Sequence, residues 1–118
     1  MTGNVMEVVN IKNAEHYVWG DGCDGWHLLK SSDVSVIREK VPPGKSELRH
    51  RHIRSEQFFY ILSGEATIEA GENRTILRPG DGLHIPPRVP HQFKNESGRD
   101  VEFLVVSAPP SHGDREDL

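Results

Sequence analysis

Cysteine is scarce in this chain of 118 residues, and an excess of positive charge is absent. The single cysteine, Cys23, cannot form an internal disulfide, which is typical of a protein from a reducing compartment. Acidic residues outnumber basic ones and give a formal net charge of -4, so the chain has no general attraction to nucleic acid or to an anionic membrane. We therefore expect neither nucleic acid nor a membrane among its partners.

Long apolar runs are absent as well. No stretch approaches the roughly 20 apolar residues of a membrane-spanning helix, and residues 1–10 lack the basic start and apolar middle of a signal peptide. These absences predict a cytoplasmic protein. The hydrophobic fraction of 35% is low, and it suits antiparallel strands, in which only alternate positions need to be apolar. The length corresponds to one domain.

Short apolar runs separated by turn residues predict an all-β protein. The turn signals recur at intervals of about 8 to 12 residues, as in sandwiches and barrels. We expect strands over 5–11, 26–30, 34–41, 58–62, 65–70, 75–77, 83–85, 91–94 and 101–107. The first of these could pair within the domain or reach a second subunit. The glycine- and aspartate-rich residues 17–26 are predicted to form a loop, and the polar, proline-led residues 109–118 a mobile tail.

Two histidines stand one residue apart in the middle of the chain. Successive side chains of a strand point to opposite faces, so His50 and His52 would share one face and could share a metal ion. Glu56 or Gln57 could supply a third ligand, and His91, after a proline-rich turn, could complete the set. An isolated H-x-H pattern can also be two exposed residues of an edge strand. The neighbouring arginines could form a basic patch for a polyanion, but inward-facing histidines would leave few of those charges on one outer face.

The spacing of these residues resembles the two sequence motifs of the cupin superfamily. The first motif has a glycine, five residues, H-x-H, three or four residues, a glutamate, six residues and a glycine; here it is matched by Gly44, His50, His52, Glu56 or Gln57, and Gly64. The second has a glycine, five residues, P-x-G, two residues, a histidine, three residues and an asparagine; here it is matched by Gly80, Pro86, His91 and Asn95. Only Arg88 departs from the pattern, because it stands where the family has glycine.

The resemblance implies a fold, a cofactor and an assembly. The fold is a cupin-like antiparallel β-barrel, or jelly roll, formed as one domain by residues 1–108, with the motifs at 44–64 and 80–95 and the tail at 109–118. Such barrels commonly associate through their N-terminal strands, which implies a homodimer. The implied cofactor is one divalent transition metal ion, and Zn, Fe, Mn, Ni and Cu all stay open.

The third ligand position of the family motif corresponds to Gln57 in this sequence. Counting back six residues from Gly64 reaches Gln57, and two adjacent residues of a strand cannot both face the site, so Glu56 is the alternative. The expected ligand set is therefore His50, His52, Gln57 and His91. This set is neutral and leaves a divalent ion its full charge, which favours an anionic ligand such as a carboxylate or an enolate.

Two further residues are candidates for catalysis. Arg88 could pair with a ligand carboxylate, or it could point to solvent as arginines in turns usually do. His84 could line the pocket as an acid or base, or pack on the opposite face. The resemblance covers dioxygenases, sugar-acid isomerases and proteins without activity. We therefore expect a metal-dependent dioxygenase or isomerase acting on a small oxygenated molecule, or a non-catalytic protein that binds or senses a small molecule or sugar.

Overall fold

Residues 6–118, which the computed structural model describes, form eleven β-strands and no helix. The strands are β1 (Glu15–Trp19), β2 (Cys23–Lys30), β3 (Ser35–Val41), β4 (His50–His52), β5 (Glu56–Ser63), β6 (Ala66–Ala70), β7 (Asn73–Leu77), β8 (Gly82–Ile85), β9 (His91–Lys94), β10 (Val101–Ala108) and β11 (Arg115–Asp117). None of the described residues therefore forms a helix able to cross a membrane. From residue 26 to residue 108 each predicted strand overlaps an observed one.

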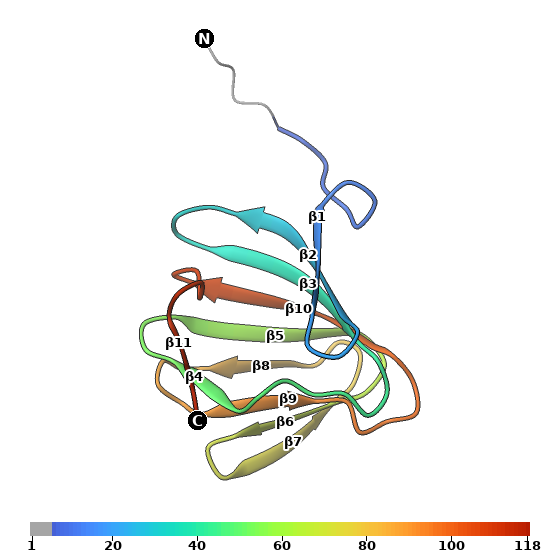
Figure 1. Ribbon diagram of the computed structural model, residues 1–118, viewed down its shortest axis with the longest axis vertical. Helices are drawn as coiled ribbons and strands as arrows, with labels where there is room; N and C mark the ends of the chain where they lie inside the picture. Colours follow the sequence, from blue (N-terminus) through green and yellow to red (C-terminus); the bar gives the residue numbers. More distant parts are fainter. Residues whose placement is uncertain (1–5) are drawn as a thin grey trace.

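The strands form two antiparallel sheets that face each other (Figure 1). The larger sheet has the strand order β1-β2-β3-β10-β5-β8, and the smaller sheet has the order β11-β4-β9-β6-β7. Strands that follow each other in the chain often lie in different sheets, and β10 returns to lie between β3 and β5. This arrangement confirms the predicted all-β class and the jelly-roll architecture.

The hydrophobic core lies between the two sheets. In β10, every second side chain from Val101 to Ser107 is buried, because alternate residues of a strand face the opposite sheet. Phe93 of the smaller sheet stacks on Phe103 of the larger sheet with ring centroids 4.1 Å apart. Phe59 lies 5.9 Å from Phe103 and 6.1 Å from the ring of His91. The aromatic core therefore extends directly to His91, the histidine of the second motif.

The N-terminal segment differs from the prediction. Of the strand expected at residues 5–11, Val5 lies outside the described residues, and residues 6–11 form no strand. Figure 1 shows this segment leading away from the sheets, so it has no neighbouring strand with which to pair. Its side chains are correspondingly open to solvent, and Met6 and Val8 are 95% and 83% exposed.

Residues 17–26 form a hairpin instead of the predicted loop. Only the short connection between β1 and β2 turns, and there Gly20 and Gly22 adopt φ angles of 55° and 77°. Gly25 lies within β2 for a different reason. The ring of Tyr17 on β1 packs across it, so that a Cβ at Gly25 would lie 2.2 Å from Tyr17 Cζ. The glycines of this segment therefore reflect both a turn and a close packing contact.

The C-terminal residues 109–118 are held against the barrel, which differs from the mobile tail expected from their composition. The strand β11 pairs with β4 in antiparallel register. Asp114, just before β11, is buried. Its carboxylate accepts hydrogen bonds at 3.2, 2.9 and 2.8 Å from the backbone N–H groups of Ile53, Arg54 and Ser55. Composition cannot reveal this anchor, because its partners lie 59 to 61 residues away in the sequence.

Candidate metal centre

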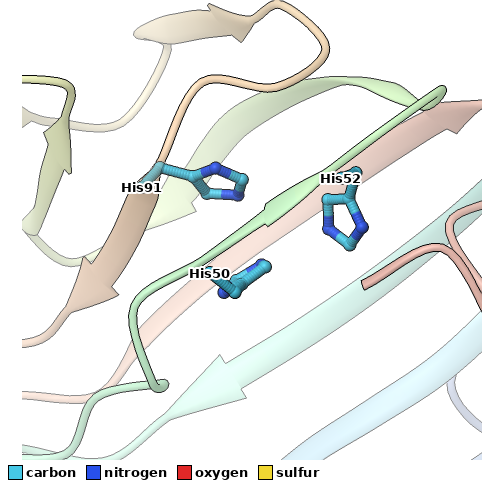
Figure 2. Close-up of side chains that lie close together, drawn as sticks. All are labelled: His50, His52 and His91. Carbon is cyan, nitrogen blue, oxygen red and sulfur yellow. The ribbon is translucent and has the colours of Figure 1, made fainter. Parts of the chain in front are cut away.

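Three histidines meet on the inner face of the smaller sheet (Figure 2). His50 and His52 lie on β4 with their side chains on one face, and His91 begins β9, where it pairs with His50. The ring centroids are 4.9 Å apart for His50 and His52, 4.4 Å for His50 and His91, and 5.8 Å for His52 and His91. One nitrogen from each ring lies within 4.8 Å of the other two. The three imidazoles could therefore bind a single ion.

Hydrogen bonds to the backbone orient two of these rings. Nδ1 of His50 lies 2.8 Å from the carbonyl oxygen of Leu48, and Nδ1 of His91 lies 3.0 Å from that of Val89. When Nδ1 donates to these carbonyls, Nε2 keeps a lone pair, as in metal-binding histidines. Nδ1 of His52 is enclosed and has no hydrogen-bond partner among residues 6–118. The backbone of Asp114 lies close enough to this ring to favour its protonated form, so the ring is not without a polar neighbour.

Burial keeps these imidazoles neutral. Removal from water lowers the pKa of His50 to about 4, and it also lowers the pKa values of His52 and His91. The positive charge of Arg115 acts in the same direction on all three rings. Because a transition metal binds the neutral form of imidazole, the set needs no deprotonation near neutral pH.

Gln57 faces the histidines. Its buried side chain donates from Nε2 to Ser107 Oγ at 3.0 Å, and its Oε1 lies 3.1 Å from Nε2 of His91. In this orientation of the amide, a neutral His91 can donate to Gln57 or to the carbonyl of Val89, but not to both. One of the two contacts then brings two lone pairs together. A cation placed between the amide oxygen and the ring nitrogen would remove this conflict, so Gln57 fits a metal site.

Glu56 and His84, two other candidates from the sequence, lie together on the outer face of the larger sheet. Glu56 Oε1 is 2.8 Å from His84 Nε2, and the two side chains are 56% and 54% exposed. They belong to the adjacent strands β5 and β8. Because side chains alternate along β5, the strand that turns Gln57 inward turns Glu56 outward. The structure therefore brings neither Glu56 nor His84 to the histidines.

Arg88 contacts the site through its backbone and not through its side chain. Its N–H donates to the carbonyl oxygen of His52 at 2.6 Å, and its φ angle is 71°. Glycine adopts this conformation at the least cost, which explains why the motif has glycine at this position. The side chain of Arg88 is exposed and does not line the cavity beside the histidines.

A cavity of about 330 Å³ opens beside the histidines. His50, His52 and Gln57 form part of its lining, and Ile37, Phe59 and Val105 add an apolar wall. Other polar side chains that sequence reasoning did not select also line it, among them Tyr17, Glu39, Glu47 and Arg115. The carboxylate oxygen Oε2 of Glu47 lies 3.8 Å from Nδ1 of His50.

Only one of these four residues, Glu39, could have been predicted from the sequence pattern to line the cavity. Glu39 shares a face of β3 with Ile37 and Val41, so an acid stands between two apolar residues on that face. Glu47 lies inside the first motif but outside the regular strands. Tyr17 belongs to the segment predicted to be a loop, and Arg115 belongs to the segment predicted to be a mobile tail. Their approach to the cavity depends on strand pairing that the sequence does not show.

Enclosure shifts the acids of the cavity toward their protonated forms. Removal from water raises the pKa of Glu39 to about 7, although the hydrogen bond from the Tyr17 hydroxyl, 3.1 Å from Oε2, opposes the rise. Burial also raises the pKa of Glu47 well above its usual value, and the charge of Glu39 adds to that effect. The cavity therefore carries less negative charge near neutral pH than its two glutamates suggest.

Comparison with known families matches residues 37–107 to the cupin domain. The chain is 33% identical over 93 residues to the uncharacterized protein MJ1618 of Methanocaldococcus jannaschii, across 78% of this chain and 74% of that protein. It is 32% identical over 85 residues to the oxalate-binding protein of Thermotoga maritima, across 68% of this chain and 70% of that protein. The solved structure of the polyketide cyclase RemF from Streptomyces resistomycificus shares the fold, with a TM-score of 0.84 at 19% identity over 97% of this chain and 86% of that one. The chain belongs to the cupin family.

The variant Glu39→Gln tests the electrostatics of the cavity in metal-free protein. The pKa of Glu39 rises from 4.5 to about 7, so the folded chain holds more protons than the unfolded chain between these pH values. The free energy of unfolding should therefore fall as the pH rises through this window, by up to about 3 kcal/mol. Urea denaturation across the window should show that Glu39→Gln lacks this part of the pH dependence.

Tyr17, Cys23 and Glu47 are present in both proteins, but the charge of Glu39 raises their pKa values. The difference between the two curves therefore reports Glu39 together with its effect on these neighbours. If the stability curves of the wild type and the variant run parallel from pH 4.5 to pH 7, Glu39 does not have the raised pKa of about 7.

Proposed function

We propose that this cupin binds one divalent transition metal ion through His50, His52 and His91, with Gln57 as the fourth ligand. The observation that carries the proposal is the meeting of three buried imidazoles whose nitrogens lie within 4.8 Å of one another. Such a donor set suits zinc, copper, iron or nickel better than manganese. When bound, the ion would serve as a Lewis acid for an oxygen of the ligand or as a site for dioxygen.

The proposed ligand is a small oxygenated molecule with a negative charge. The volume of the cavity, about 330 Å³, limits its size, and a neutral ligand set leaves the charge of the ion uncompensated. Arg115 adds a cation to the lining of the same cavity. We therefore assign to Arg115 the carboxylate-binding role that the sequence suggested for Arg88. The similarity to an oxalate-binding protein supports a ligand of this kind.

Turnover of the ligand is the first candidate function, and binding without turnover is the second. Glu39 and Glu47 line the cavity and have raised pKa values, which are properties of groups that exchange protons with a substrate. This observation favours an enzyme, and both dioxygenase and isomerase chemistry are compatible with the proposed ion. The similarity to an oxalate-binding protein supports the second candidate, a binding or sensor protein.

The exposed apolar residues suggest a homodimer. On the outer face of the larger sheet, Val18, Phe58 and Tyr60 are 65%, 42% and 39% exposed. The N-terminal segment is also apolar and exposed at Met6 and Val8, and it leads away from its own sheets (Figure 1). We infer that the N-terminal segment of one chain packs on the outer face of the larger sheet of a second copy, because this contact would cover both apolar surfaces.

Metal content tests the ligand set. Protein purified without a metal-affinity tag should contain about one ion per chain by elemental analysis, and the double variant His50→Ala, His52→Ala should contain none, because two of the nitrogens are lost. Gln57→Ala should bind the ion more weakly. Glu56→Ala is the matched control at the adjacent, outward-facing position and should bind it as the wild type does. Full occupancy in the double variant would refute the site.

Oxalate binding to the metal-loaded protein tests whether Arg115 or Arg88 binds the carboxylate of the ligand. A charge-assisted hydrogen bond to a carboxylate contributes about 1.5 to 3 kcal/mol, so Arg115→Gln should weaken oxalate binding about tenfold or more in calorimetric titrations. Arg88→Gly restores the residue of the motif and should leave the affinity unchanged. The assignment to Arg115 is wrong if its variant binds oxalate like the wild type.

Sedimentation at several concentrations tests the dimer. The wild type should sediment as a dimer, and both Val18→Glu and removal of residues 1–11 should shift it toward the monomer, because each disturbs one side of the proposed contact. Ile76→Glu is the matched control, since Ile76 is 44% exposed on the smaller sheet. A wild type that is monomeric at high concentration, or a dimer that survives both changes, would argue against this interface.

A further inference from the structure

Tyr17, Gly25 and Glu39 form a row across the inner face of the larger sheet. Tyr17 of β1 pairs with Gly25 of β2, and Gly25 pairs with Glu39 of β3. Because the central residue is glycine, the ring of Tyr17 can lie across it, and the hydroxyl reaches Glu39 to donate a hydrogen bond to Oε2 at 3.1 Å. In this row, the hydrogen bond from Tyr17 therefore orients the carboxyl group of Glu39 through one of its two oxygens.

A ligand held at the histidines would occupy the same cavity as this carboxyl group. Tyr17 and Glu39 line the same cavity as His50, His52 and Gln57. Within residues 6–118, the Tyr17 hydroxyl is the only side-chain group that forms a hydrogen bond with Glu39, so the second carboxyl oxygen has no side-chain donor. This oxygen does not belong to the fully enclosed polar atoms of residues 6–118 that lack a partner, so it stays accessible from the cavity. A hydroxyl group of the ligand could therefore reach it.

We propose that Glu39, oriented by Tyr17, binds a hydroxyl group of the ligand and accepts its proton. The inference rests on the proposed function, because it places the other oxygens of the ligand at the metal ion. It narrows the ligand to small acids and ketones that also carry a hydroxyl group. In the transfer, the ligand O–H bond breaks, an O–H bond forms on the unused oxygen of Glu39, and the electron pair stays on the ligand oxygen. No oxidant or other reactant takes part.

The groups around Glu39 suit a reversible proton transfer. The titratable and charged groups that influence it or respond to it are Tyr17, Cys23, Glu47 and Arg115. Burial favours the protonated acid, while the Tyr17 hydroxyl and Arg115 favour the carboxylate. Their balance puts the pKa of Glu39 at about 7, where the group can both accept and return a proton near neutral pH.

Malate and its deoxy analogue succinate are the probes that test this inference, because they differ by one hydroxyl group. The metal-loaded wild type should bind the better enantiomer of malate about tenfold or more tightly than succinate, and Glu39→Gln should lose that preference. Calorimetry in two buffers of different ionisation enthalpy counts the protons taken up by the buffer. At pH 7 part of Glu39 is protonated, and that proton must leave before the group can accept one from the ligand. At this pH the count should therefore differ between wild type and Glu39→Gln for malate and not for succinate.

Two further variants separate proton acceptance from a structural role. Tyr17→Phe keeps the carboxylate but removes its orienting donor, so it should reduce the preference for malate. Glu102→Gln alters an acid on the outer face of β10, outside the cavity lining, and should leave the preference unchanged.

The outcomes distinguish the inference from the proposed function. If the wild type takes up no metal ion, the proposed function fails and the inference fails with it. If the protein holds about one ion per chain but Glu39→Gln keeps the preference for malate, or neither probe binds, the inference alone is wrong. Should Glu39→Gln not fold, an unchanged preference in Tyr17→Phe overturns the proposal and a reduced one supports it.

Discussion

Enclosure between the two sheets is the constraint on which the chemistry of the site depends. Loss of contact with water disfavours charge of either sign, so it lowers the pKa of His50 and raises that of Glu39. The imidazoles are thereby kept in the form that binds a metal ion. The acid in the same cavity is brought to a pKa at which it can exchange a proton near neutral pH. One physical cause thus prepares both the ligands and the acid, because it acts on bases and acids in opposite directions.

Enclosed polar groups also need partners, and much of the geometry of the site follows from how the chain supplies them. Backbone carbonyls orient two of the three imidazoles. The buried carboxylate of Asp114 holds the turn of residues 53–55, which connects His52 to the strand that carries Gln57. A residue near the C-terminus therefore helps to set the distance between two candidate ligands. The pairing of β11 with β4 brings Arg115 to the cavity at the same time.

The position of Arg88 shows how a motif can be matched and still be misinterpreted. The family glycine at this position marks a backbone conformation, which Arg88 adopts with a φ angle of 71°. The residue therefore completes the turn before His91 while its side chain stays exposed. A glycine in a motif marks a backbone conformation, so a charged residue at the same position is not thereby placed in the pocket. Here the turn explains the motif, and the cation that lines the cavity is Arg115 from another part of the chain.

The sequence by itself determined the fold class, most of the strands and the shared face of His50 and His52. These depend on local properties, namely the two-residue period of a strand and the spacing of turn residues, and the same period turns Gln57 inward and Glu56 outward. The place of His91 beside the other two histidines was expected from the resemblance to the family motifs, and the pairing of β4 with β9 produces it. Tertiary structure alone decided that the tail is anchored, that residues 17–26 form a hairpin and which charges share the cavity. Each of these results needs contacts between segments distant in the chain, such as the row from Tyr17 to Glu39 across three strands. Burial then sets the charge of those groups, and burial is a property of the packed molecule, which no local pattern encodes.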